Sequence, residues 1–232
     1  MRPRGMRSDT GQSAHRASAT RIREPGSPWT PANPADGEAS LAGIARRCVR
    51  DRFPPVMGRR VLELGCGSGD HLAFFLASGA EAVIGVDTAA EAIVRAARRF
   101  DEAPADLIVH DFSEPVPMWR WSADLTLVNL TRADPVDLDV MLREARRLTM
   151  PGGEVHVLAE HPCATGSDPA GMGAGAWWKP GLARPTADYL RAAERAGLAF
   201  RDLHEVGLGG GAPLSRQPSR PAVVLIGFRV YQ

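Results

Sequence analysis

Apolar residues along this chain change their spacing in a way that predicts alternating strands and helices. A short apolar run, Val61–Leu64, is typical of a buried parallel strand. From His71 onward the apolar positions follow a helical spacing, and Glu81–Val86 forms a second apolar run. Strand, helix and strand in this order predict a βαβ unit between Arg60 and Asp87.

The same alternation continues on both sides of this unit. We expect helices over Glu38–Phe53, Ala89–Arg99, Val136–Leu148 and Pro185–Ala196, and strands over Asp106–Val109, Ala123–Leu130, Glu154–Ala159, Leu198–Val206 and Ala222–Val230. Met150–Gly153 reads as a tight turn, and the glycine- and proline-rich segment 207–220 as a hairpin connection. The pattern predicts one α/β domain over residues 38–232, with helices on both faces of a mostly parallel sheet.

Residues 1–37 differ from the rest because they are rich in Arg, Ser, Pro and Gly and lack apolar periodicity. We expect a disordered or loosely docked tail, with Trp29 as the residue that would dock on the domain. Its arginines are also compatible with a transit peptide or a nucleic-acid-binding arm, and a start site placed too far upstream is a further alternative.

The glycine turn inside the βαβ unit is the strongest functional signal. Gly65 and Gly67 allow positive φ and lack a Cβ, so the backbone can pass close to a ligand. Asp87 ends the second strand, where a carboxylate can accept hydrogen bonds from a ribose diol. A dinucleotide fingerprint would require a third glycine where Asp70 stands, which argues against a nicotinamide-dependent oxidoreductase. Glu63 precedes the turn and completes the pattern ExGxGxG.

This pattern resembles motif I of the class I S-adenosylmethionine-dependent methyltransferases. The resemblance covers Glu38 to the C-terminus, is strongest over Val61–Asp111 and includes the Pro-Gly-Gly turn before the fifth strand. It implies a Rossmann-like seven-stranded sheet whose last strand is antiparallel, with S-adenosylmethionine as the cofactor. It also implies an acid after the third strand that binds the adenine. The predicted cofactor-binding residues are Glu63, Gly65, Cys66, Gly67, Gly69, Asp87, Thr88, Asp111, Phe112 and Asn129.

The acceptor region is expected after the fifth strand, where Glu160–Arg184 breaks the regular rhythm. His161 is the candidate general base, with a turn histidine fixed by the following proline as the alternative. Trp177, Trp178 and Tyr189 are candidates for an apolar acceptor wall, with core packing as the alternative. His161 and Cys163 are too few for a metal site, so no metal is expected. His156, inside a strand, is expected to face the core or the sheet.

Composition and one missing motif reduce the classes of partner that we expect. The net charge of +1 gives no nucleic-acid or membrane signal, the three scattered cysteines fit a reducing cytoplasmic setting, and no apolar run approaches a transmembrane length. Asn129 is not followed by Pro-Pro-Tyr, the signature of base-modifying amino-methyltransferases. The resemblance, together with the absence of a second domain and of a basic surface signal, implies methyl transfer to an oxygen or nitrogen of a small molecule, for example a secondary metabolite. An RNA or protein acceptor and a non-catalytic cofactor-binding partner are the alternatives, and the sequence leaves the oligomeric state open.

Overall fold

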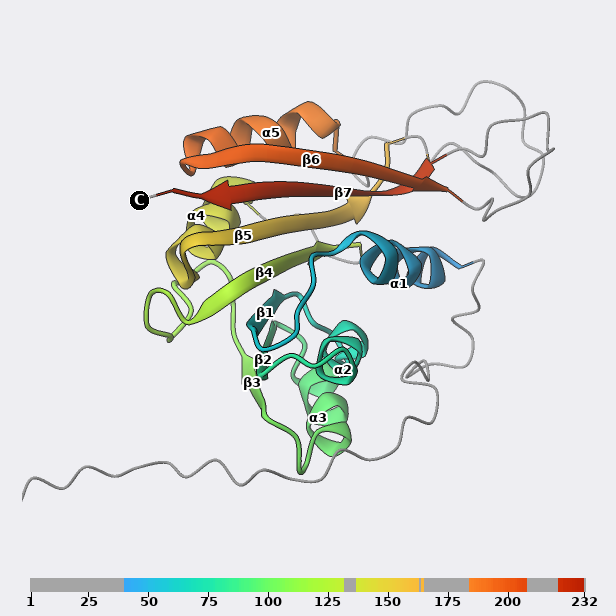
Figure 1. The fold of residues 1–232 in the computed structure, drawn as a ribbon, viewed down its shortest axis with the longest axis vertical. Helices are drawn as coiled ribbons and strands as arrows, with labels where there is room; N and C mark the ends of the chain where they lie inside the picture. The colour runs from blue at the N-terminus through green and yellow to red at the C-terminus, as the bar shows by residue number, and fades with distance from the viewer. Residues whose placement is uncertain (1–39, 132–136, 163, 165–183, 208–220, 232) are drawn as a thin grey trace, which may run out of the picture.

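The computed structural model describes residues 40–131, 137–162, 164, 184–207 and 221–231 (Figure 1). The expected tail over 1–37, with Trp29, lies outside these residues, as do Cys163, Trp177 and Trp178. No helix in the described part of the chain has the length and apolar character needed to cross a membrane.

A seven-stranded sheet forms the centre of the described domain. Its strands are β1 (Arg60–Leu64), β2 (Ala82–Asp87), β3 (Ala105–Val109), β4 (Ala123–Leu130), β5 (Thr149–Glu160), β6 (Leu198–Gly207) and β7 (Pro221–Val230). They lie in the order β3-β2-β1-β4-β5-β7-β6. Only β7 runs against its neighbours, β5 and β6. The predicted fold class, with its reversed last strand, is confirmed.

Five helices in the described residues cover the two faces of the sheet. Helices α1 (Leu41–Arg52), α2 (Asp70–Ala77) and α3 (Ala90–Arg99) pack on one face, and α4 (Leu138–Leu148) and α5 (Thr186–Arg195) on the other (Figure 1). Each face has its own apolar cluster, because alternate side chains of the buried strands point to opposite sides. Phe75 and Leu125 lie in the first cluster, and Leu142 and Phe228 in the second.

Two predicted boundaries are corrected by local hydrogen bonding. Helix α4 starts at Leu138, because the Asp137 carboxylate caps it by accepting from the backbone N–H groups of Asp139 and Val140. The turn expected at Met150–Gly153 is instead a bulge inside β5. Its pairing with β4 jumps from Ala123↔Thr149 to Leu125↔Glu154.

A charge cluster surrounds the buried carboxylate of Glu154 in β5. Glu154 lies 2.6 Å from an Arg201 nitrogen and 3.1 Å from an Arg229 nitrogen. His156 Nε2 lies 3.1 Å from the same carboxylate, and its ring centroid is 5.0 Å from that of Phe53. His156 is 1% exposed, so its predicted sheet-face position is confirmed.

We expect Glu154 to make folding sensitive to acid. The hydrogen bond from His156 and the charges of Arg201 and Arg229 lower the pKa of Glu154 from 4.5 to about 2. A lowered folded-state pKa stabilises the protein above pH 4.5, and this stability is lost as the pH falls toward 2. Glu154→Gln should therefore lower the unfolding free energy at pH 7 by about 1–3 kcal/mol.

Urea denaturation across the pH range measures this effect. The difference between wild type and Glu154→Gln should shrink below pH 4.5, whereas Glu102→Gln, at an exposed glutamate, should match wild type throughout. A difference that stays constant from pH 7 to the acid limit would contradict the assignment.

Candidate cofactor-binding site

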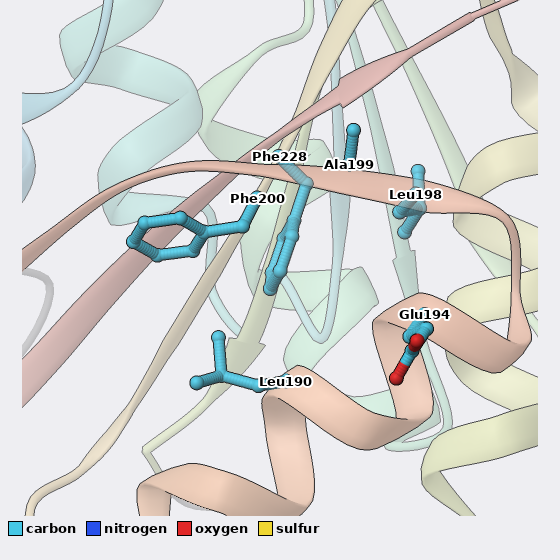
Figure 2. A pocket seen from close by; sticks show the side chains of 6 residues that line it. All are labelled: Leu190, Glu194, Leu198, Ala199, Phe200 and Phe228. Carbon is cyan, nitrogen blue, oxygen red and sulfur yellow. The ribbon is translucent and has the colours of Figure 1, made fainter.

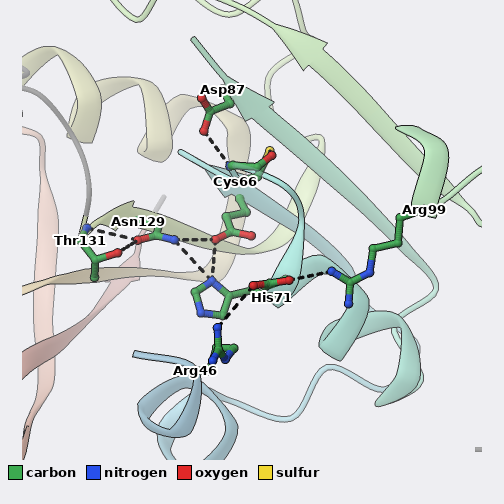
Figure 3. A network of polar contacts seen from close by, with 10 residues as sticks. Arg46, Cys66, His71, Asp87, Arg99, Asn129 and Thr131 are labelled. Carbon is green, nitrogen blue, oxygen red and sulfur yellow. Dashed lines mark hydrogen bonds and ion pairs between the residues drawn. The ribbon is translucent and has the colours of Figure 1, made fainter. Parts of the chain in front are cut away.

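The predicted glycine turn lies at the carboxyl end of β1, between β2 and β4 (Figure 3). A Cβ at Gly65, where φ is 83°, would lie 2.5 Å from the backbone oxygen of Asn129. A Cβ at Gly69, where φ is 80°, would lie 2.5 Å from the Phe100 ring. The chain passes so close to β4 and α3 that only glycine fits at these two positions. The turn thereby brings α2 down onto the end of the sheet.

Gly67 differs from its two neighbours because the space above it is open. A Cβ there would meet no atom within 4 Å. The Gly67 N–H donates to Asp87 Oδ2 at 2.7 Å, and the Ala89 N–H donates to Asp87 Oδ1 at 2.8 Å. Asp87 therefore ties the glycine turn to the end of β2 and places a carboxylate beside the open space, as expected of a ribose-binding acid.

Glu63 is the centre of a polar network beneath the turn. Its side chain is fully buried, and its Oε1 lies 2.7 Å from His71 Nδ1 and 3.0 Å from Asn129 Nδ2 (Figure 3). Thr131 Oγ1 donates to Asn129 Oδ1 at 2.8 Å, which fixes the amide so that its NH₂ faces Glu63. The other carboxylate oxygen, Glu63 Oε2, is buried and has no hydrogen-bond partner within the described residues.

The unsatisfied oxygen of Glu63 indicates a missing donor. Leaving a buried carboxylate oxygen unpaired costs free energy, and folded proteins rarely do so without a reason. A cationic donor is the best match for it, because it also balances the buried negative charge. The residues present therefore fit a ligand that carries an ammonium group near the glycine turn.

A second set of contacts fixes the start of α2. Asp70 Oδ1 lies 2.7 Å from an Arg99 nitrogen of α3, and Asp70 Oδ2 lies 3.5 Å from an Arg46 nitrogen of α1. Arg46 is buried, so this ion pair lies inside the helical layer. The residue that departs from a dinucleotide fingerprint thus links three helices.

The remaining predicted cofactor residues surround this centre with different degrees of support. Cys66 is buried, which raises the pKa of its thiol, and its Sγ lies 3.7 Å from the Gly67 carbonyl oxygen. Thr88 is exposed directly after β2. Asp111 is exposed after β3 and accepts from the Ser113 N–H at 2.9 Å, which lowers its pKa. Phe112 packs half-buried beside it. Adenine contacts by Asp111 and Phe112 stay a prediction.

The described structure places two of the predicted acceptor residues, Tyr189 and His161. Tyr189 of α5 is 4% exposed in the apolar cluster with α4, which favours its packing interpretation. His161 is buried after β5, with its N–H donating to Ala222 O and its Nε2 2.9 Å from Glu205 Oε1 on β6. No cluster of potential metal ligands occurs in the described part of the chain.

Sequence reasoning missed His71 and Thr131 as parts of the site. His71 comes from the first turn of α2, and Thr131 from the residues after β4. Nothing in their spacing marks them, because the contact depends on how β1 and β4 pair. The only available signal was that both follow the carboxyl end of a central strand.

Comparisons with known proteins indicate a methyltransferase domain. Residues 61–153 match the family model of a methyltransferase domain. A tRNA U34 carboxymethyltransferase from Saccharophagus degradans is 32% identical over 119 residues, which cover 46% of this chain and 34% of the relative. The chain thus matches about a third of that relative's length.

Solved structures share the fold. An S-adenosylmethionine-dependent methyltransferase from Mesorhizobium loti has a TM-score of 0.66 at 22% identity, over 82% of this chain and all of the other. A Haloferax volcanii methyltransferase in complex with the activator Trm112 has a TM-score of 0.63 at 17% identity, covering 88% and 100% of the two chains. Over residues 61–153, which include the ExGxGxG turn, this chain is therefore similar to a methyltransferase domain, and its fold is that of the S-adenosylmethionine-dependent methyltransferases of known structure.

Proposed function

We propose that this chain binds S-adenosylmethionine over its glycine turn and transfers the methyl group to an acceptor at the carboxyl ends of β4 and β5. The observation that carries the proposal is the buried, unpaired Oε2 of Glu63, which would accept from the ammonium of the methionine moiety. Asp87 would accept from the ribose hydroxyls, while Gly67 leaves room for the ligand against the backbone.

When bound, S-adenosylmethionine supplies a methyl group that is already electrophilic because it is attached to a sulfonium sulfur. The chain's own contribution is then to hold the acceptor in line with the departing sulfur. The Glu63–Asn129–Thr131 network would hold the cofactor for this alignment, because hydrogen bonds lock its side chains in one orientation.

For the acceptor we propose RNA as the first class to test, because the curated relative acts, by its name, on U34 of tRNA. A small-molecule acceptor, expected from the sequence, is the competing proposal. The segment that matches the methyltransferase family model, residues 61–153, includes the cofactor half of the domain, and Trp177 and Trp178, the candidate acceptor wall, lie outside the described residues.

Two measurements test these proposals in sequence. Calorimetric titration should show micromolar binding of both S-adenosylmethionine and S-adenosylhomocysteine; folded protein that binds neither would overturn the cofactor proposal. Methyl-labelled cofactor should then label total tRNA. Label in the small-metabolite fraction of a cell extract, with tRNA unlabelled, would support the competing acceptor.

Binding without turnover would point to a partner. The Haloferax methyltransferase of the same fold is found in complex with an activator. Under that outcome the chain would be a catalytic subunit that needs an activator, or a non-catalytic cofactor-binding subunit. Addition of cell extract to the labelling reaction distinguishes these two, because only the first regains turnover.

We propose His161 as the general base and Glu205 as the residue that orients its ring. His161→Ala should lower turnover by about 100-fold, the range of general-base effects, with cofactor affinity unchanged within about twofold. Glu205→Gln, which keeps a hydrogen-bonding oxygen, should lower turnover less. Full turnover by His161→Ala, measured by methyl labelling, would make it a turn residue fixed by Pro162.

A further inference from the structure

Large apolar side chains are exposed at one end of the sheet. Eight such residues are exposed in the described structure, and six of them lie where the parallel strands begin, opposite the glycine turn: Met57, Trp119, Trp121, Met150, Phe200 and Tyr231. Met57 precedes β1, the tryptophans precede β4, Met150 starts β5, Tyr231 follows β7, and Phe200 is near the start of β6. Because β1, β4, β5, β7 and β6 are successive neighbours, these residues lie in a row along one end of the sheet.

The loop that carries the tryptophans is held in place. The Arg147 guanidinium of α4 donates to the carbonyls of Val116 and Met118, both at 2.9 Å, and pairs with Glu144. The Trp121 N–H donates to Arg147 O at 3.1 Å, and Trp121 has a φ of 63°, which is unfavourable for a bulky residue. Trp119, 89% exposed, therefore projects from a fixed loop.

A pocket lies at the same end of the molecule, between α5 and β6 (Figure 2). It encloses about 410 Å³ and is lined by Leu190, Glu194, Leu198, Ala199, Phe200 and Phe228. Glu194 is the only charged side chain of this lining. The pocket is lined by residues of α5, and the tryptophan loop accepts hydrogen bonds from Arg147 of α4, so both lie on the face of the sheet that carries α4 and α5.

We propose that this end of the molecule binds a second copy of the chain, with Trp119 of each copy inserted into the α5–β6 pocket of the other. The same chain carries both the projecting indole and the apolar pocket, as a two-fold symmetric interface requires. The charges are also complementary, because Arg120 follows Trp119 in the chain, with its guanidinium over the Trp121 ring, and Glu194 lines the pocket. The inference concerns assembly and holds whether or not the chain transfers methyl groups.

The exposed aromatic area is more than half of what a standard interface buries on each partner. The four exposed aromatic residues alone, Trp119, Trp121, Phe200 and Tyr231, would bury on the order of 500 Å² per chain. Standard interfaces bury roughly 800 Å² per partner and are rich in Trp, Tyr, Met and Arg. Anchoring aromatic residues in desolvated pockets provide most of the binding energy of such interfaces.

Sedimentation velocity on the full chain tests the proposal. Wild type should be dimeric at about 100 µM, and Trp119→Ala should weaken dimerisation at least about tenfold, as loss of an aromatic anchor does. Val94→Ala changes an exposed valine on α3 that does not belong to this end of the sheet, and the variant should dimerise as wild type does. Because Trp119 points into solvent in the monomer, thermal unfolding should be unchanged when each variant is measured as a dilute monomer.

A charge exchange tests the orientation. Arg120→Glu and Glu194→Arg should each weaken the dimer, and the variant with both changes should regain it, because both contacts then carry reversed charges. A monomeric wild type, a Trp119→Ala variant that dimerises as wild type does, or a double variant no better than the single ones would overturn the proposal.

Discussion

Replacement of Asp87 by alanine should weaken S-adenosylmethionine binding by at least about tenfold, the loss expected for a charge-assisted hydrogen bond. Two effects combine in this variant. The ribose loses its proposed carboxylate acceptor, and the N–H groups of Gly67 and Ala89 lose the acceptor that holds the glycine turn against β2. Calorimetric titration with the cofactor measures the loss.

Asp124 offers a matched control for this prediction. It also accepts a backbone N–H, that of Arg60, at 2.7 Å, but it lies at the opposite end of the sheet. Asp124→Ala should therefore lower stability to a similar extent and leave cofactor affinity unchanged. If Asp87→Ala bound the cofactor as wild type does, or if Asp124→Ala weakened binding equally, the ribose assignment would fail.

The fold could be predicted from the sequence because each of its signals is local. The apolar runs of β1 and β2, the glycines between them and the acid that ends β2 all lie within one βαβ unit. Burial on both faces makes such strands nearly continuous apolar runs, which sequence patterns reveal well. Boundaries set by side-chain capping or bulging, at Asp137 and within β5, were missed because they depend on individual hydrogen bonds.

The polar network of the site could not be predicted in the same way. Glu63 and Asn129 are separated by 66 positions and meet because β1 pairs with β4. His161 shows the same limit on the acceptor side, since its contact with Glu205 spans 44 positions and depends on β7 lying between β5 and β6. The sequence placed Asn129 and His161 at the carboxyl ends of their strands, but it did not reveal which residues they contact.

The exposed tryptophans give the opposite case, in which sequence shows the residues but not their environment. Trp119 and Trp121 lie in a stretch between two strands that any pattern would assign to a loop. Their role depends on exposure, on the hydrogen bonds from Arg147, and on a pocket formed by residues about seventy or more positions later. None of these features produces a periodic pattern of residues in the sequence.

Glu63→Gln should separate cofactor binding from stability. The substitution keeps the shape of the side chain and an oxygen for His71 and Asn129, but it replaces the unpaired Oε2 by an NH₂ group. That group cannot accept from an ammonium, so affinity for S-adenosylmethionine should fall at least about tenfold. The unfolding free energy of the ligand-free protein should equal or exceed that of wild type, because a buried charge is removed.

Glu154→Gln is the matched comparison, since Glu154 is also a buried glutamate of the central sheet but has all its charge partners within the chain. It should lose stability and keep its affinity, the reverse of Glu63→Gln. Calorimetry and urea denaturation of the two variants together test this contrast. Wild-type affinity in Glu63→Gln would show that Oε2 is not where the cofactor binds. A marked loss of stability there would show that the carboxylate serves the fold, because a residue kept for its ligand need not stabilise the unliganded protein.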